Sequence, residues 1–207
     1  MNGVSIRKRS TLYRKSAATI RWLHIYLSML GFTALMFFSL TGITLNHPTW
    51  FGASEQRIVD EDGQLPVDWM EEDSAAGINQ LMIAEHLRQE HSLRGRVTEF
   101  ETSEFDVMVV FKSPGYAADV FINRDDGRYT VTTITSGVVS IMNDLHKGRD
   151  SGPGWSILID ASAVILMLFS ISGFALLLYL KRRRLNGIVV ATLGTIAMIA
   201  VWGIWVH

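Results

Sequence analysis

Three long stretches of the chain carry no charged side chain, and they limit the possible folds more than any other feature. The first lies between Arg21 and Glu55, the second runs from Ala161 to Leu180, and the third from Leu185 to His207. A helix needs about 20 apolar residues to cross a bilayer core roughly 30 Å thick. The first stretch is too long for a cleaved signal peptide and has no A-x-A site. We therefore predict three transmembrane helices, at residues 20–47, 153–180 and 187–207.

The charges divide the rest of the chain between two sides of a membrane. Ten lysines and arginines, with no acidic residue among them, lie in residues 1–21 and 181–184. Residues 48–152 hold 19 of the 20 acidic residues against 9 basic ones, a net charge of −10. Because cytoplasmic loops are enriched in Lys and Arg, we expect a cytoplasmic N-terminus (1–19), a cytoplasmic loop (181–186) and an extracytoplasmic domain (48–152). In a bacterium this is an inner-membrane protein with a periplasmic domain.

The intervening domain has the patterns of a small α+β fold. Residues 78–91 have a helical apolar spacing. Asp125-Asp126-Gly127 predicts a hairpin, and Ser113-Pro114-Gly115 predicts another turn. The acidic segment 60–73 is expected to be a loop-like linker. Strand-like runs are found at residues 96–101, 106–111, 119–123 and 129–134.

Three histidines lie where the apolar runs meet water: His24, His47 and His146. Imidazoles at the ends of charge-free membrane helices are a usual way to hold b-type haem, with one ring nitrogen on each face of the iron. The alternative is that interfacial histidines are simply tolerated there. No cysteine is present, which excludes disulfides, thiolate metal sites, iron–sulfur clusters and c-type haem attachment. Haem b is therefore the expected cofactor, with these histidines as axial ligands and no separate catalytic residue.

Helix geometry limits how the three histidines can pair. His24 and His47 are 23 residues apart, about 34 Å along a helix that rises 1.5 Å per residue, so they cannot share one iron. His47 and His146 both lie at the outer surface, and Pro48 ends the helix beside His47. We predict a His47–haem–His146 pair. His24 then needs a ligand from a second copy of the chain or a non-histidine ligand, and we favour a homodimer.

Other residues near these histidines are candidates for cofactor contacts. Gly31 and Gly42 share a stripe with His24 and would admit either a macrocycle or a packed helix. Lys147 and Arg149 suit haem propionates but are equally ordinary as interfacial cations. Residues 36–42 and 167–173 form a short internal repeat, whose hydroxyls would bond either propionates or carbonyls of the preceding turn. Three further residues have a less specific interpretation: Asp160 as structural or proton-accepting, and His86 and His91 as solvated or loosely metal-attracting.

Taken together, R-W-L-H (21–24), T-G-x-x-L (41–45), D-L-H (144–146) and S-x-S-G (170–173) resemble the PepSY-associated transmembrane family over residues 20–184. The resemblance implies a PepSY-like module inserted between membrane helices. It also implies haem ligation by His24 and His146, with His47 as a third ligand. The family includes FoxB-like b-type cytochromes that reduce ferric iron or ferric siderophores, and a short VciB-like form. Larger members have a fourth helix and more histidines, which this chain lacks.

The expected function is that of an inner-membrane haem-dependent ferric reductase that supports ferrous iron uptake. Hydrated ferric iron suits carboxylate oxygens, and the candidate encounter residues are Asp60, Glu61, Asp62, Glu71, Glu72 and Asp73, whose alternative role is a solubilising linker. No dinucleotide fingerprint is present, so a quinol or a cytosolic flavoprotein must donate electrons. Membrane lipid is an expected partner and nucleic acid is not. The competing functions are a PepSY-type regulatory or partner-binding protein without redox activity and an accessory subunit of an iron transporter.

Overall fold

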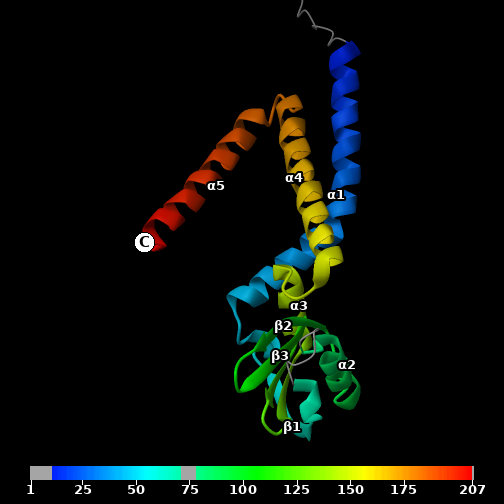
Figure 1. Cartoon of the computed structure of the whole chain (residues 1–207). Coiled ribbons are helices and arrows are strands. Elements are labelled where there is room, and N and C mark those ends of the chain that lie inside the picture. Colours follow the sequence, from blue (N-terminus) through cyan, green and yellow to red (C-terminus); the bar gives the residue numbers. More distant parts are fainter. Residues whose placement is uncertain (1–10, 71–77, 207) are drawn as a thin grey trace, which may run out of the picture. The chain divides into compact units, whose positions relative to one another are not determined.

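The computed structural model describes residues 11–70 and 78–206. Three long helices account for the charge-free runs: α1 (Thr11–Asn46), α4 (Gly152–Tyr179) and α5 (Arg184–Trp205) (Figure 1). Each is long and apolar enough to cross a membrane. The prediction of three such helices is confirmed, although α1 begins at Thr11 instead of residue 20 and α5 at Arg184 instead of residue 187.

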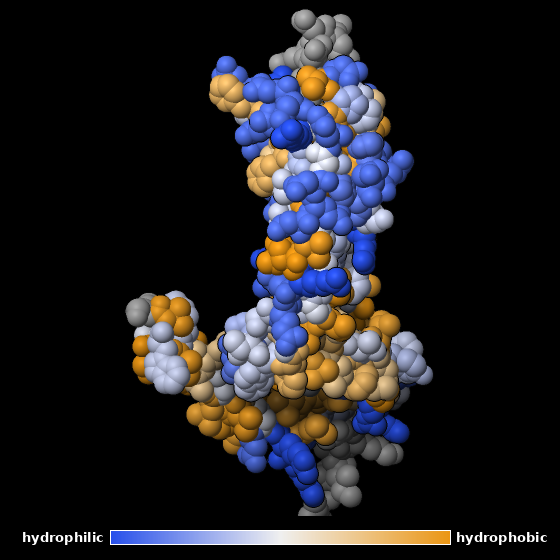
Figure 2. All heavy atoms as spheres, turned by 90° about the horizontal axis from the view of Figure 1, so that it is seen from below, coloured by the Kyte–Doolittle hydropathy of each residue, from blue (hydrophilic) through white to orange (hydrophobic). Residues whose placement is uncertain are grey.

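The long helices expose apolar side chains that a water-soluble protein would bury. Leu30 of α1, Val190 and Ile204 of α5 are 66%, 69% and 71% exposed, and none of the described residues of α5 is buried. Figure 2 shows hydrophobic side chains gathered over one part of the surface and hydrophilic ones over another. A helix that is apolar all round belongs in a membrane or in a large protein core. With so few buried residues in these helices, the membrane is the environment that fits.

The chain forms two compact units, and α1 and α4 each contribute to both. The first unit comprises the residues up to 36 and residues 160–207. Within it α1 and α4 run antiparallel: Tyr13 packs on Tyr179 at one end, and Gly31 packs on Ile165 and Leu166 further along. A Cβ on Gly31 would lie 3.2 Å from side-chain atoms of both α4 residues. Gly31 therefore lies in close helix packing, and its predicted contact with a macrocycle stays a prediction.

The second unit, residues 37–159, contains a five-stranded antiparallel sheet. Its strand order is β1-β5-β4-β3-β2. The predicted turns at residues 113–115 and 125–127 connect β3 to β4 and β4 to β5, and both hairpins are confirmed. The strands are β1 (Gln56–Gln64), β2 (Arg96–Thr102), β3 (Asp106–Ser113), β4 (Tyr116–Asn123) and β5 (Arg128–Ser136).

A single helix covers one face of this sheet and forms the core with it. Helix α2 (Gln80–Glu90) begins at Asn79, whose side chain accepts a hydrogen bond from the Met82 amide at 3.1 Å. Its residues Ile83 and Leu87 are fully buried against alternate residues of the inner strands. The sheet residues of this core include Val107, Val109, Phe111, Val120, Ile122 and Val131. The α+β prediction for this domain is confirmed.

Two elements of the second unit differ from the prediction. The acidic segment expected to be a linker begins as an edge strand, because β1 pairs with β5 over residues 56–64. A short 3-10 helix follows at Val67–Met70. Helix α3 (Val138–Lys147), which was not predicted, carries His146 in its last turn and ends at Gly148 in the left-handed conformation (φ 69°). The adjacent Gly115 amide donates to the Asp144 carboxylate at 2.9 Å, which joins α3 to the β3–β4 turn.

Candidate functional site: two histidine cradles

His24 lies against three residues of α4 within the first unit. Its Nδ1 is 2.9 Å from Ser172 Oγ. Its ring stacks on Phe169, with centroids 5.0 Å apart and planes inclined by 19°. A Cβ on Gly173 would lie 3.1 Å from His24 Cε1, so only glycine allows the ring to approach this closely. We call Phe169, Ser172 and Gly173 the His24 cradle.

His146 of α3 lies against three residues of α1 within the second unit. Its Nδ1 is 2.6 Å from Thr41 Oγ1, and its ring meets Phe38 edge-on at a centroid distance of 5.1 Å. Its Cε1 lies 3.9 Å from the position of a Cβ on Gly42, an ordinary contact distance. Phe38, Thr41 and Gly42 form the His146 cradle. A further polar contact one turn along, from Thr44 Oγ1 to Asn143 Oδ1 at 2.6 Å, holds α3 on α1.

The two cradles are built from the two copies of the internal repeat. Phe38, Thr41 and Gly42 occupy the same positions in residues 36–42 as Phe169, Ser172 and Gly173 occupy in residues 167–173. Each copy thus supplies a ring, a hydroxyl and a glycine to one histidine from another helix. The repeat and the histidines are both visible in the sequence, but only the fold brings them together. The equal spacing of Phe, hydroxyl and Gly was the available signal.

The hydroxyls determine which nitrogen of each histidine carries hydrogen. Thr41 Oγ1 donates to the Phe37 carbonyl at 2.6 Å, and Ser172 Oγ donates to the Phe169 carbonyl at 2.7 Å. A hydroxyl has one hydrogen and a carbonyl has none to give. Each hydroxyl must therefore accept from the histidine, which makes Nδ1 the protonated nitrogen. In the neutral ring Nε2 then keeps a free lone pair. Of the two predicted roles for these hydroxyls, the bond to the preceding turn is the one observed.

Neither Nε2 has a hydrogen-bond partner among the described residues, and both rings are partly exposed. This is the state that a metal-binding histidine requires, with the second ring nitrogen donating to a fixed acceptor. No cluster of three or more His, Cys, Asp or Glu side chains arranged to hold a metal ion occurs in the part of the chain that the structure describes. Each cradle offers one nitrogen ligand.

His47 is placed differently from the other two histidines. It follows the last residue of α1, as Pro48 predicts, and its ring stacks on Trp50 with centroids 3.8 Å apart and planes inclined by 8°. A metal binds imidazole in the plane of the ring, so stacking on one face leaves both nitrogens accessible. Within residues 11–70 and 78–206, His47 and His146 share no hydrogen bond or ring contact. The His47–haem–His146 pair stays a prediction.

The remaining candidates near the helix ends make ordinary surface contacts. Lys147 and Arg149 are both exposed, and Arg149 lines a cavity of about 530 Å³ with Asp144 and Asp150. Asp160 is exposed on α4. A role for Lys147 and Arg149 toward propionates stays a prediction. His207, Glu71, Glu72 and Asp73 lie outside the described residues.

His91 was predicted to be solvated or loosely metal-attracting, and the structure contradicts the first of these alternatives. Its side chain is only 9% exposed. Its Nδ1 donates to Glu61 Oε2 at 2.6 Å, and the Tyr129 hydroxyl lies 2.9 Å from its Nε2. The prediction was wrong because it treated Glu61 as part of a loop, whereas β1 brings this residue beside α2. His86 packs edge-on to Trp69 at 5.3 Å.

Tyr129 completes this group and is almost fully buried. Burial raises the pKa of the Tyr129 hydroxyl above its ordinary value of 10.0, and the charges of Glu90 and Glu61 raise this pKa further. The hydroxyl is therefore a stable donor to His91 Nε2 at neutral pH. The chain Glu61–His91–Tyr129 thus fastens β1 and β5 to the end of α2.

Two of the predicted iron-encounter acids are also engaged by β5. Asp60 accepts a hydrogen bond from Thr132 and Asp62 one from Thr130, each at 2.8 Å. Both carboxylates remain on the exposed edge of the sheet. Their second oxygens can still meet a cation, and their first oxygens hold the edge strand in register.

Long apolar helices, an inserted α+β domain and paired histidine cradles define a membrane protein with a PepSY-like domain. The family model PepSY_TM_like_2, which describes PepSY_TM-like proteins, matches residues 18–207. The chain therefore belongs to the PepSY_TM-like family, and the predicted kinship with PepSY-associated membrane proteins is confirmed. Searches among curated proteins and among solved structures find no match. The likeness to FoxB-like reductases stays a prediction.

Proposed function

We propose that the protein is an inner-membrane b-type cytochrome that holds haem b through His24 and His146. It would pass electrons to ferric iron or a ferric complex outside the cytoplasm. The observation that carries the proposal is the shared state of the two rings: Nδ1 donates to a fixed hydroxyl, and Nε2 presents a lone pair. This is the state in which a histidine ligates a metal.

The residues present fit a haem in their chemistry. The cradles supply neutral imidazole nitrogens, the usual protein ligands for b-type haem iron. The aromatic rings of Phe38 and Phe169 offer apolar surroundings next to each ligand. With two histidine ligands, haem b supplies one-electron transfer and leaves no open coordination position. In this proposal Thr41 and Ser172 hold each ligand ring in position, and they exclude the tautomer whose Nε2 is protonated and so cannot bind metal.

Each iron needs a second axial ligand, and two sources are available. His47 is the intrachain candidate for the iron held by His146, because its in-plane nitrogens are accessible. His24 has no histidine neighbour among the described residues of its own unit, so a second copy of the chain would supply its partner. This argument supports a homodimer. Six helices would also exclude lipid from the cofactor better than three.

The charge distribution supports the direction of electron flow. The cation-rich segments favour a cytoplasmic N-terminus and α4–α5 turn, and the acidic sheet domain would then face the periplasm. Ferric iron is a hard cation that prefers carboxylate oxygens, and exposed carboxylates on β1 would attract it. A quinol or a cytosolic flavoprotein would donate the electrons.

The first test is the absorption spectrum of the protein purified from haem-replete cells. We expect a Soret band that shifts on reduction with dithionite, and pyridine haemochrome quantification gives the number of haems per chain. His24→Ala and His146→Ala should each remove part or all of this spectrum. His86→Ala is the matched control, because His86 packs on Trp69 in the sheet domain, and it should leave the spectrum intact. A colourless folded protein would refute the proposal.

A membrane-tethered binding protein is the second candidate. The observation that favours it is the sheet domain, which has its own complete hydrophobic core and would fold around that core without a cofactor. A regulator or an accessory subunit of an iron transporter would need only this domain and an anchor. Stable, colourless protein that copurifies with a partner would support this candidate.

A further inference from the structure

We propose that the first unit binds the headgroup of an anionic phospholipid in a basic pocket beside the α4–α5 turn. The pocket is a cavity of about 470 Å³ between the N-terminal part of α1 and the end of α4. Its cationic lining residues are Arg21, Lys181, Arg182 and Arg183. This inference is independent of the haem proposal, because no residue of either histidine cradle lines the pocket.

The cations of this pocket have no acidic counterpart nearby in the chain. Asp160 is the only acidic residue outside residues 55–150, and it is not among the pocket residues. None of the four cations forms an ion pair with a carboxylate of the described residues. Four like charges around one cavity repel one another unless an anion lies between them. We therefore expect the ligand of this pocket to carry concentrated negative charge.

The walls of the pocket are held in place by contacts between α1 and α4. The Tyr13 hydroxyl donates to the Tyr179 carbonyl at 3.3 Å, and the Tyr179 hydroxyl donates to Ser16 Oγ at 3.2 Å. The two tyrosine rings also pack with centroids 5.0 Å apart. The cavity is thus formed before any ligand enters, which lowers the ordering cost of binding.

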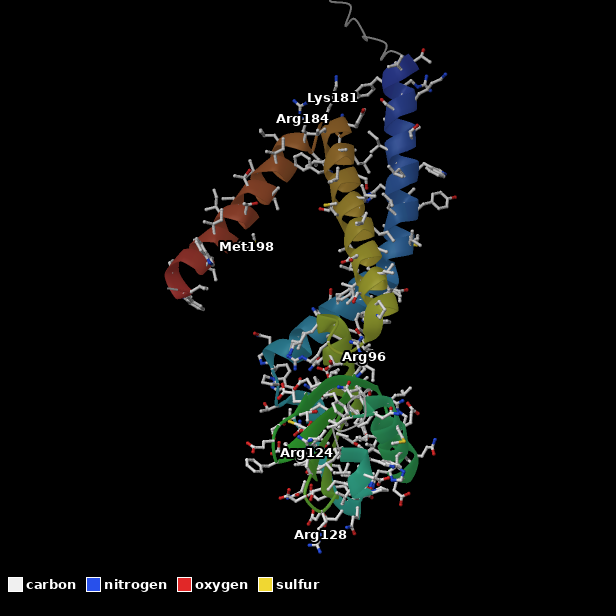
Figure 3. The ribbon with its side chains drawn as sticks, in the orientation of Figure 1. Arg96, Arg124, Arg128, Lys181, Arg184 and Met198 are labelled. Atoms are coloured by element: carbon white, nitrogen blue, oxygen red, sulfur yellow. The ribbon has the colours of Figure 1, made fainter. Side chains whose placement is uncertain are left out.

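The apolar residues of the pocket indicate a lipid instead of a soluble anion. Ala17, Leu176 and Leu180 line the same cavity as the cations. Figure 3 shows Lys181 on the turn after α4 and Arg184 at the start of α5. The turn thus joins two apolar helices, where a span meets the headgroup region. Basic pockets between transmembrane helices at this level bind anionic lipid headgroups. A phosphate among the cations would leave its acyl chains beside the leucines.

The test compares two double variants that remove the same charge. Arg21→Gln with Arg183→Gln removes two cations of the pocket. Arg14→Gln with Arg184→Gln removes two cations from the same helix and the same basic run, but neither residue lines the pocket. Each full-length protein is reconstituted in nanodiscs of phosphatidylcholine and phosphatidylglycerol and re-extracted in mild detergent. Mass spectrometry then measures the phosphatidylglycerol retained per chain.

We expect the pocket pair to retain several-fold less phosphatidylglycerol than the unmodified chain, and the control pair to retain the same amount. Ala17→Leu fills the cavity and leaves every cation in place, so it should also reduce retention. This variant keeps the proposal testable if the charge variants fold poorly. Equal loss in both pairs would overturn the proposal in favour of diffuse surface attraction. Displacement of the lipid by inorganic phosphate alone would overturn it in favour of a soluble anion.

Discussion

Thr41 and Ser172 show how one hydroxyl can determine the chemistry of a histidine far away in sequence. His146 is 105 residues from Thr41, and His24 is 148 residues from Ser172. In each pair the hydroxyl hydrogen goes to a carbonyl of its own helix, so the histidine must donate. In the proposed function the hydroxyl positions the ring, and the imidazole Nε2 is the haem ligand.

Removing these hydroxyls should lower the affinity for haem, although the ligands His146 and His24 remain in place. We expect Thr41→Val and Ser172→Ala to lower haem retention by about 10–100-fold, because loss of a partner to a ligating histidine has effects of this size. The midpoint potential should shift as well, which a purely structural role would not cause. Ser170→Ala is the control, since Ser170 lies in the same repeat but is exposed and bonds neither histidine. Unchanged retention and potential in both hydroxyl variants would contradict the positioning role.

The glycines of the two cradles should respond differently to the same substitution. A Cβ on Gly173 would lie 3.1 Å from His24 Cε1, and one on Gly42 would lie 3.9 Å from His146 Cε1. Gly42→Ala should be neutral or stabilising by up to about 1 kcal/mol, from helix propensity. Gly173→Ala should cost about 1–3 kcal/mol through overpacking, since the ring is held by Ser172 and Phe169. Thermal unfolding in detergent measures both, and equal effects would argue against the close ring contact.

At the scale of secondary structure, the sequence predicted those helices and strands whose apolar residues follow a clear pattern. The spanning helices are apolar along their length, β3 is rich in buried apolar residues, and β4 alternates between buried and more exposed residues over most of its length. Strand β1 escaped prediction because every one of its side chains is at least partly exposed, and backbone pairing with β5 alone defines it. Its acidic side chains also protect the sheet edge from pairing with another chain.

Helix α3 escaped prediction for another reason. It is only 10 residues long, and it lies between a strand and an apolar run whose stronger patterns obscure it. The sequence placed all three candidate histidines at helix ends. His146 lies in the last turn of α3 and His47 follows α1, but His24 lies inside α1, because this helix begins at Thr11. The cradle residues that contact His24 and His146 could not be predicted from the sequence. They lie on other helices, and only tertiary packing brings them next to the histidines.

The contact between β1, β5 and α2 should make the sheet domain sensitive to alkaline pH. Burial raises the pKa of Tyr129, so the folded domain holds this proton more tightly than the unfolded chain. The hydrogen bond to Glu99 likewise raises the pKa of Lys112 above 10.5. A raised pKa contributes stability below the unfolded value, and this contribution is lost as pH rises through the folded pKa.

We therefore expect the unfolding free energy of the domain to fall as pH rises above about 10, where unfolded Tyr begins to ionise. Tyr129→Phe should lower stability at neutral pH, because His91 loses its partner, and should flatten the alkaline decline. Denaturant unfolding of the full chain, followed by sheet circular dichroism across this pH range, measures both effects. Tyr116→Phe is the control, since Tyr116 is only half-buried. An identical pH profile in the Tyr129 variant would contradict the assignment.

At the scale of the whole molecule, the charges predict how the chain crosses the membrane. Ten of the 19 basic residues lie in residues 1–21 and 181–184, and nearly all the acids lie in residues 55–150. Because the chain has no cysteine, this membrane topology can be tested directly with single cysteines introduced at chosen positions. Arg128, whose side chain is 78% exposed, represents the sheet domain, and Lys181 represents the α4–α5 turn.

We expect Arg128→Cys to react with a membrane-impermeant maleimide in intact spheroplasts. Lys181→Cys should react only after the membrane is permeabilised, because the cation-rich turn would face the cytoplasm. Labelling is read by the mass shift of each variant, and the unmodified chain, which has no thiol, is the blank. The reverse pattern would invert the proposed topology and place the acidic domain inside the cell.

The hydroxyl-to-carbonyl bonds of the cradles have a consequence for proton movement. A proton wire needs every member to accept at one side and release at the other. Here each imidazole donates to a hydroxyl, and the hydroxyl donates to a main-chain carbonyl. The carbonyl has no proton to donate further, so the path ends there. Neither ring can therefore serve as a relay along this path. Under the proposed function, reduction of a haem held by either ring would not be balanced by a proton moving through that ring.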